Sequence, residues 1–136
     1  MQQPVVHAFF ESQSFTYSYL VWDPLSKEAA VIDPVLDFDA ASGSTHTSSA
    51  EQIMAKVKEH NLTVQWLLET HVHADHLSAA PFLKRQLGGH IAIGSRITEV
   101  QQLFSQVFNL KDLKTDGSAF DKLFADGEDF MLGTIR

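Results

Sequence analysis

Three of the seven histidines, His71, His73 and His76, lie within six residues, and Asp75 lies among them. Neutral imidazole is a good ligand for zinc and ferrous iron, and a carboxylate adds negative charge and a harder oxygen ligand. Residues two apart on an extended segment point the same way, so His71 and His73 can face one point while Asp75 and His76 face a neighbouring one. The spacing predicts two adjacent metal positions that share a bridging hydroxide, about 3.5–4 Å apart in sites of this kind.

The residues around the cluster decide between a metal site and a solvated polar turn. A lone His-x-His motif is more often a polar turn. Here four candidate ligands follow an apolar segment, residues 62–68, and precede Ser78, which can cap a helix. A loop above a strand end is held from below and open above, and a catalytic metal needs such an open position for water, oxygen or substrate. The context therefore favours the metal site.

The nearest acid and the remaining histidines give weaker signals. Asp33 follows apolar residues 30–32 and precedes Pro34. It can orient an imidazole of the cluster through a hydrogen bond, although a plain strand-ending turn is the simpler interpretation. The other histidines are assigned to structure or solvent, and only the one in the polar segment 33–49 is kept as a secondary candidate: His7, His46, His60 and His90.

Strands and helices have to position the cluster. Runs of β-branched and aromatic residues predict an antiparallel opening, because turn residues separate them. Strands are predicted at 5–10, 15–22, 29–32, 62–68, 91–93 and 130–132. Helices are predicted at 50–60, 79–87 and 97–107, the last with Ile97, Val100, Phe104 and Val107 turned inward. Residues 33–49 are rich in Asp, Ser, Thr and Gly, which predicts a long surface loop.

Composition narrows the classes of partner and cofactor. The 136 residues are 44% hydrophobic, enough for the core of one domain. The net charge of −7, with scattered basic residues, argues against a nucleic-acid partner. There is no cysteine, so a metal must be held by imidazole and carboxylate. We find neither a targeting signal nor an apolar run of about 18 residues, so we expect a cytoplasmic protein with no membrane partner.

The segment Thr70–His76, read as Thr-His-Val-His-Ala-Asp-His, resembles the signature of the metallo-β-lactamase superfamily. With Ala74 before Asp75 it is similar to the persulfide dioxygenase and glyoxalase II branch, and the likeness extends to residues 14–19, 31–37, 77–80 and 83–94. The resemblance implies an α/β (α+β) fold, the αββα sandwich with a mixed sheet and outer helices. Residues 1–136 would form a single partial domain, the N-terminal half, with the C-terminal half missing.

The resemblance also implies ligand sets. In a persulfide dioxygenase one Fe(II) is held by two histidines and an aspartate, of which only His71 has a counterpart here. In the glyoxalase II pattern two Zn(II) ions are bound, one by His71 and His73 and the other by Asp75 and His76. Asp75 is also the predicted catalytic residue. The remaining ligands would come from a Thr-Pro-Gly-His segment and later residues, which do not occur after Gly127.

The leading functional prediction is a persulfide dioxygenase that, in its complete form, oxidises glutathione persulfide with O2 to sulfite. The first alternative is a glyoxalase II-type hydrolase of hydroxyacylglutathione thioesters. The second is a catalytically inert metal-binding fragment or assembly module. The expected ligand is a small thiol-derived molecule. We also expect a homo-oligomer or pairing with the missing half, because a lone half exposes sheet edges and an apolar face.

Overall fold

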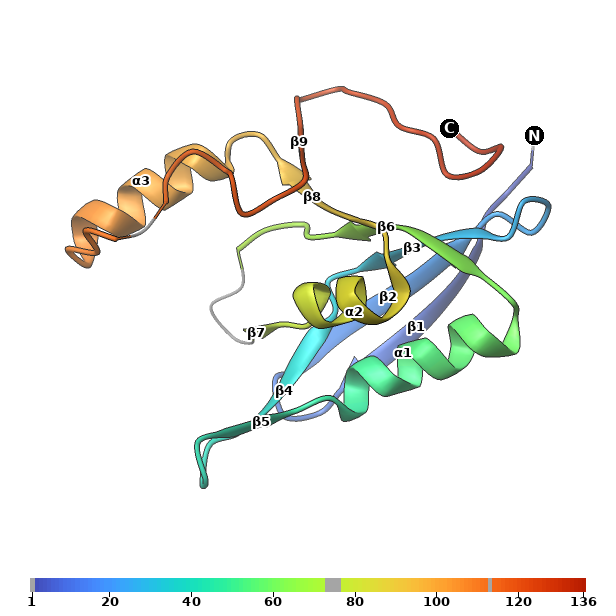
Figure 1. Cartoon of the computed structure of the whole chain (residues 1–136), viewed down its shortest axis with the longest axis horizontal. Coiled ribbons are helices and arrows are strands. Elements are labelled where there is room, and N and C mark those ends of the chain that lie inside the picture. The colour runs from blue at the N-terminus through green and yellow to red at the C-terminus, as the bar shows by residue number, and fades with distance from the viewer. Residues whose placement is uncertain (1, 73–76, 113) are drawn as a thin grey trace.

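A computed structural model describes residues 2–72, 77–112 and 114–136. Within them, strands form a mixed six-stranded sheet in the order β1-β2-β3-β6-β8-β9 and a three-stranded sheet in the order β5-β4-β7 (Figure 1). The strands are β1 (Val5–Glu11), β2 (Thr16–Trp22), β3 (Glu28–Ile32), β4 (Val35–Asp39), β5 (Ser44–His46), β6 (Thr63–Leu68), β7 (Leu77–Ser78), β8 (His90–Gly94) and β9 (Lys122–Phe124). The helices are α1 (Ser48–Glu59), α2 (Ala80–Leu87) and α3 (Ile97–Val107).

The large sheet combines an antiparallel opening with a parallel half. β1 pairs antiparallel with β2, and β2 with β3, which confirms the predicted opening. β3, β6, β8 and β9 are parallel neighbours, so their carboxyl ends meet at one edge of the sheet. β6 ends at Leu68, and the predicted metal loop follows directly. The sequence prediction that a strand leads into the histidine cluster is therefore confirmed.

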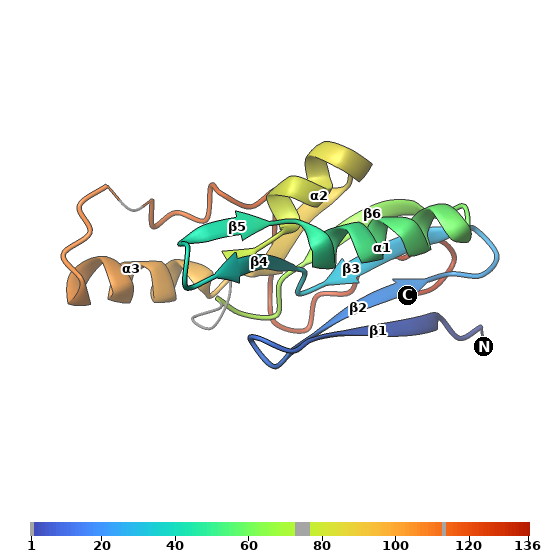
Figure 2. The same ribbon diagram turned by 90° about the horizontal axis from the view of Figure 1, so that it is seen from below.

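One face of the large sheet carries the core. Alternate strand residues such as Leu20, Val31 and Leu67 are fully buried there, together with Ile53 of α1 and Leu83 of α2. α1 and α2 lie side by side over this face (Figure 2). Burial of this face, rather than helix propensity, fixes the two helices, because isolated helices of 12 and 8 residues are marginal in water.

The opposite face is covered in part. The C-terminal residues cross it and enclose a small cavity against the strands. Its lining includes Val21, Ala30, Ile32 and Leu68 from the sheet and Phe130, Leu132 and Ile135 from the C-terminal segment. Toward β1 the same face is open, and Val6, Phe10 and Tyr17 are 58%, 53% and 52% exposed.

Residues 33–49 are not the long loop that their composition predicts. β4 pairs with β5 and with β7, so this stretch forms a hairpin. Its polar side chains close the turn: the Asp39 carboxylate accepts hydrogen bonds from the Ala41 N–H and the Ser42 hydroxyl. Loop-like composition therefore arises from turn chemistry between two short strands.

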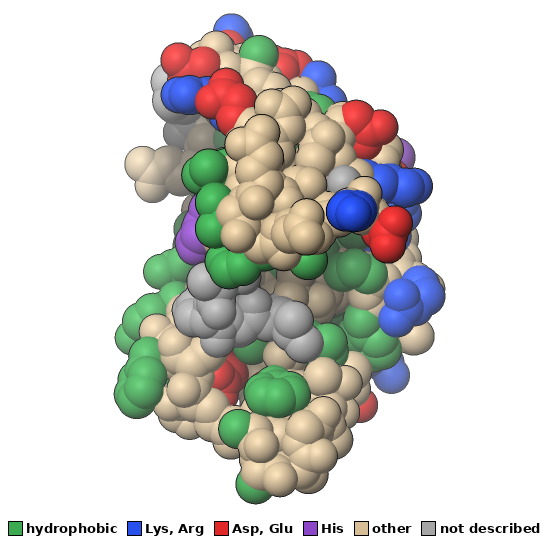
Figure 3. All heavy atoms as spheres, turned by 90° about the vertical axis from the view of Figure 1, so that its left-hand side faces the viewer, with side chains coloured by type: hydrophobic (Ala, Val, Ile, Leu, Met, Phe, Trp, Pro, Cys, Tyr) green, Lys and Arg blue, Asp and Glu red, His purple; other side chains and the backbone are tan. Residues whose placement is uncertain are grey.

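Two further predictions are wrong in detail. Residues 130–132 form no strand, and only a single bridge joins Leu132 to Ile135. α3 is a helix as predicted, but of its predicted inward residues only Ile97 is buried, and Val107 is 64% exposed. α3 extends away from the sheet, and hydrophobic side chains are spread over that end of the molecule (Figures 1 and 3). Among the described residues, no helix is long and apolar enough to span a membrane.

Candidate metal centre

The entrance to the predicted metal loop is fastened by Asp33. Its Oδ1 accepts the Thr70 N–H at 2.8 Å, and its Oδ2 accepts the Thr70 hydroxyl at 2.6 Å. The Asp33 backbone is fixed as well, because its N–H donates to the Leu68 carbonyl and its own carbonyl accepts the buried Ser18 hydroxyl. Asp33 has a positive φ of 51° and is 9% exposed. The turn after β3 therefore aims this carboxylate at the end of β6.

The same contacts determine how His71 is held. Thr70 Oγ1 lies 2.8 Å from His71 Nδ1. The single hydroxyl proton of Thr70 is donated to Asp33, so Thr70 Oγ1 accepts from Nδ1–H. This contact places a proton on His71 Nδ1, so a metal would be bound through Nε2. A second partner on the other ring nitrogen is the usual arrangement of a metal-binding histidine.

Both interpretations of Asp33 in the sequence analysis, a strand-ending turn and a residue that orients an imidazole, apply to it. The residue ends a strand in a tight turn, as the simpler interpretation holds. It also orients an imidazole of the cluster, but through the Thr70 hydroxyl rather than by direct contact. Asp33 and Thr70 are 37 residues apart, so only the pairing of β3 with β6 reveals the contact.

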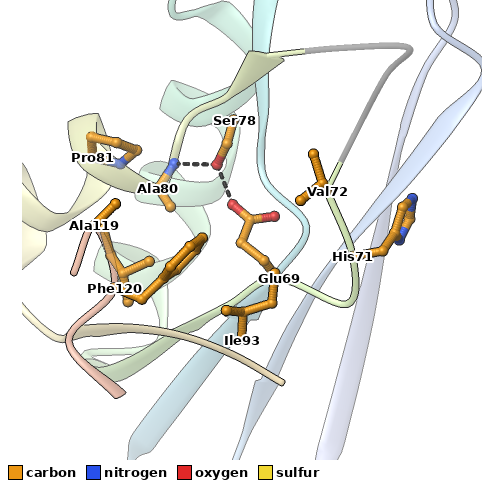
Figure 4. A pocket seen from close by; sticks show the side chains of 10 residues that line it. Glu69, His71, Val72, Ser78, Ala80, Pro81, Ile93, Ala119 and Phe120 are labelled. Atoms are coloured by element: carbon orange, nitrogen blue, oxygen red, sulfur yellow. Dashed lines mark hydrogen bonds between the residues drawn. The ribbon is translucent and has the colours of Figure 1, made fainter. Parts of the chain in front are cut away.

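The exit of the loop is fastened by Glu69, which the sequence analysis missed. The Ser78 hydroxyl donates to Glu69 Oε1, and Ser78 Oγ accepts the Ala80 N–H at 3.0 Å (Figure 4). Glu69 is 8% exposed, and its own N–H donates to the Ala92 carbonyl of β8. The available signal was an acid at the end of a buried apolar strand, directly before Thr70.

Two cavities border this segment. One, of about 300 Å³, is mainly apolar, and in Figure 4 the Glu69 carboxylate and Val72 extend toward it while the His71 ring points away. Its lining also includes Ile93 and Phe120. The other, of about 580 Å³, is more polar and is lined by Thr70, His71, Ser95, Arg96, Phe124, Asp126 and other residues. His71 therefore stands at the border of a space large enough for a small molecule.

The remaining predicted site residues are placed only in part. His73, Asp75 and His76 lie outside the described residues, so their role as ligands, and that of Asp75 as catalytic residue, stays a prediction. Within residues 2–72, 77–112 and 114–136, no three His, Asp or Glu side chains are grouped so that they could hold one ion. His46 lies elsewhere, 3.7 Å from Asp37, whose carboxylate accepts the Ser49 N–H at the start of α1.

The described residues fit a metal bound by imidazole. With Nδ1 engaged by Thr70, His71 would bind a metal through Nε2, and its ring is held by the Thr70 hydroxyl, which in turn donates to the Asp33 carboxylate. A carboxylate–histidine arrangement of this kind orients metal ligands and raises their basicity. The loop also begins at the carboxyl edge of parallel strands, where open α/β sheets place their ligand sites.

Residues 12–133 match the model of the metallo-beta-lactamase superfamily, and the chain belongs to this superfamily. The predicted resemblance and the predicted fold class are confirmed. Two solved structures share the fold. The chain is 31% identical to ETHE1 from Myxococcus xanthus, with a TM-score of 0.55 over 65% of this chain and 34% of that one. The B3 metallo-beta-lactamase BLEG-1 aligns at 19% identity and a TM-score of 0.62, over 96% of this chain and 57% of that one.

Three relatives show the range of proteins that contain this sequence pattern. A beta-lactamase hydrolase-like protein of Xylella fastidiosa is 48% identical over 100% of this chain and 32% of its own. Glyoxylase B2 of Dictyostelium discoideum is 40% identical over 96% of this chain and 46% of its own. The mitochondrial persulfide dioxygenase ETHE1 of Bos taurus is 34% identical over 71% of this chain and 34% of its own. The chain thus spans a third to a half of the length of these relatives.

Proposed function

We propose that this chain contributes part of the metal site of a persulfide dioxygenase, an enzyme that oxidises glutathione persulfide with O2 to sulfite. The observation that carries the proposal is the Asp33–Thr70–His71 chain of hydrogen bonds, which prepares His71 to bind a metal through Nε2. The similarity to the persulfide dioxygenases of Bos taurus and Myxococcus xanthus supports the reaction class.

In this proposal His71 would bind one Fe(II) ion, whereas the second histidine and the aspartate of the persulfide dioxygenase ligand set have no counterpart in residues 1–136. Such an ion would supply the redox chemistry of oxygen activation. This chain contributes positioning: Asp33 and Thr70 hold the His71 ring, and the carboxyl edge of β6 and β8 supports the loop. His73, Asp75 and His76 are the further residues of the same loop proposed to face the metal site.

The larger of the two cavities beside His71 is the proposed place for the thiol-derived substrate. Its volume of about 580 Å³ falls in the range of small-molecule sites. Ser95, which directly follows β8, and Arg96, which also pairs with Glu99, offer polar groups at its wall. An Arg guanidinium recognises carboxylates such as those of glutathione.

The second candidate is hydrolysis of a glutathione thioester by a dizinc site. The similarity to Glyoxylase B2 of Dictyostelium discoideum, over nearly the whole chain, favours it. The ligands would be His71 and His73 for one Zn(II), and Asp75 and His76 for the other. Both candidates require the same Asp33–Thr70–His71 arrangement, so the reaction has to be decided by measurement.

The test uses the full-length protein loaded separately with Fe(II) and Zn(II). Oxygen uptake on addition of glutathione persulfide, lost in His71→Ala, is the expected result. Hydrolysis of S-lactoylglutathione without oxygen uptake would instead establish the second candidate. Absence of both reactions, together with stoichiometric metal binding, would leave a metal-binding or assembly module.

A further inference from the structure

We infer that Glu69 is a positioning residue of the proposed metal site, where it holds the exit of the loop through the Ser78 hydroxyl. The inference rests on the proposed function, because it concerns the affinity of that site for metal. It goes beyond the histidines and aspartate of the cluster. The residues that carry it are Glu69, Ser78 and Ala80, all at described positions.

Glu69 and Thr70 are adjacent residues that hold the two ends of the loop through different partners. The Thr70 hydroxyl donates to Asp33, which directly follows β3, whereas the Glu69 carboxylate accepts from Ser78, the last residue of β7. One dipeptide at the end of β6 therefore ties the loop entrance to β3 and the loop exit to β6.

Ser78 is fixed in a single hydrogen-bonding role. Its Oγ accepts the Ala80 N–H, which leaves the hydroxyl proton to be donated, and Glu69 receives it. The backbone around Ser78 is held as well, because Ser78 pairs with Val35 of β4 and the Ala79 N–H donates to the Pro34 carbonyl. The contact thus joins the end of β6 to the start of α2.

The apolar surroundings of Glu69 indicate that its carboxylate has a specific role beyond packing. The adjoining cavity is lined mainly by apolar side chains, among them Val72, Ile93 and Phe120. Placing a carboxylate there costs free energy unless hydrogen bonds compensate, and an apolar side chain would avoid this cost. A gain at the metal site offsets the cost, because the bond joins Glu69, before the loop, to Ser78, after it, before any metal binds.

The experiment measures the affinity of the full-length protein for Zn²⁺ by competition with a chromophoric chelator, and the visible absorption of the Co²⁺-loaded protein. We expect Glu69→Ala and Ser78→Ala to weaken Zn²⁺ binding by about 10–100-fold, the range for residues that orient metal ligands. The double variant should lose less than the sum of the two single losses, because both changes break the same hydrogen bond between Glu69 and Ser78. Glu69→Gln, whose side-chain carbonyl still accepts from Ser78, should restore most of the affinity.

A matched control and the contrary outcomes separate the possibilities. Glu51→Ala removes an exposed acid on α1 and should leave both the affinity and the Co²⁺ spectrum unchanged. Unchanged affinity in Glu69→Ala and Ser78→Ala, while His71→Ala abolishes binding, would overturn this inference and leave the proposed function standing. A lower Tm with unchanged affinity would show a purely structural role and also overturn it. If the unmodified protein binds no metal, the proposed function itself fails.

Discussion

Asp23 and Asp33 are alike in sequence and different in what they hold. Each follows the last residue of a strand and precedes a proline, in Trp22-Asp23-Pro24 and Ile32-Asp33-Pro34. Each is buried, at 0% and 9% exposure. Because β2 and β3 run antiparallel and each aspartate follows the last residue of its strand, the two carboxylates lie at opposite ends of the strands of the large sheet.

The partners of the two carboxylates come from different parts of the chain. Asp23 accepts from its own turn, at Leu25 N–H and Ser26 Oγ, and from the N–H and hydroxyl of Thr134, 111 residues away. Asp33 accepts the N–H and hydroxyl of Thr70. The dipeptide Asp-Pro therefore holds the C-terminal segment where it follows β2, and the metal loop where it follows β3. What a buried aspartate does depends on the segment that the fold brings to it.

The largest expected effect is a difference in metal affinity between variants of Asp33 and Asp23. Asp33→Asn replaces Oδ2 by an amide that cannot accept the Thr70 proton, so the His71 ring loses its support. We expect Zn²⁺ binding to the full-length protein to weaken by about 10–100-fold. Asp23→Asn is the matched control and should change the affinity less than threefold, on the order of 0.6 kcal/mol. Equal losses in both variants would refute the division of roles.

The next effect tests the hydrogen-bonded link between Asp33 and His71 at its middle member. Thr70→Val keeps the shape of the side chain and removes the hydroxyl, while Thr70→Ser keeps the hydroxyl. We expect about tenfold weaker Zn²⁺ binding for the valine variant and near-normal binding for the serine variant. An unaffected valine variant would show that Asp33 acts only through the Thr70 N–H.

Most of the fold could be predicted from the strand and helix patterns of the sequence. The antiparallel opening, the strand before the cluster and the three helices were predictable because their apolar residues recur with the period of a strand or a helix. The first helix, predicted to end at residue 60, ends at Glu59, and Asn61 shortly after it has a φ of 53°, in the left-handed region that Asn tolerates. The prediction of a long loop for residues 33–49 was wrong, because two short strands joined by a polar turn have the same composition as a loop.

Less of the candidate site than of the fold could be predicted from the sequence. The signature located the candidate ligands, but nothing local shows that Asp33 bonds Thr70 or that Glu69 bonds Ser78, because both contacts depend on which strands are neighbours. The helix pattern of α3 was correct, but its apolar stripe lies mainly on the surface. Periodicity identifies an apolar face without saying what covers it.

The third effect concerns stability and belongs to Asp23. Asp23→Ala removes the acceptor for both Thr134 bonds and both turn bonds, so the C-terminal segment should detach from the sheet. We expect Tm to fall by several degrees and limited proteolysis to remove residues near Phe130 faster. Asp33→Asn should leave the rate of cleavage in this segment unchanged. Resistance of the Asp23→Ala protein to the protease would contradict the role as a fastening.

The pH dependence of stability should come from the same carboxylate. Burial by itself raises the pKa of Asp23, but hydrogen bonds from Thr134, Leu25 and Ser26 outweigh it and hold the pKa well below its ordinary value of 3.8. A pKa depressed in the folded state stabilises the protein above the ordinary value, and this contribution is lost as the pH falls toward the folded value. The Tm difference between the unmodified chain and Asp23→Asn should therefore be constant from about pH 7 to 5 and shrink below about pH 4.

The smallest expected effect concerns the open part of the sheet face. Val6, Phe10 and Tyr17 are exposed on it, and we propose that residues 1–136 self-associate there, because an apolar sheet face tends to be covered. Sedimentation velocity should show weaker association for Phe10→Ser, whereas Val107→Ser, on the exposed stripe of α3, serves as the control. Asp23→Ala should strengthen association, because the detached C-terminal segment uncovers more of the same face. Weakening by Val107→Ser alone would assign the contact to α3, and the Asp23 fastening would then have no part in it.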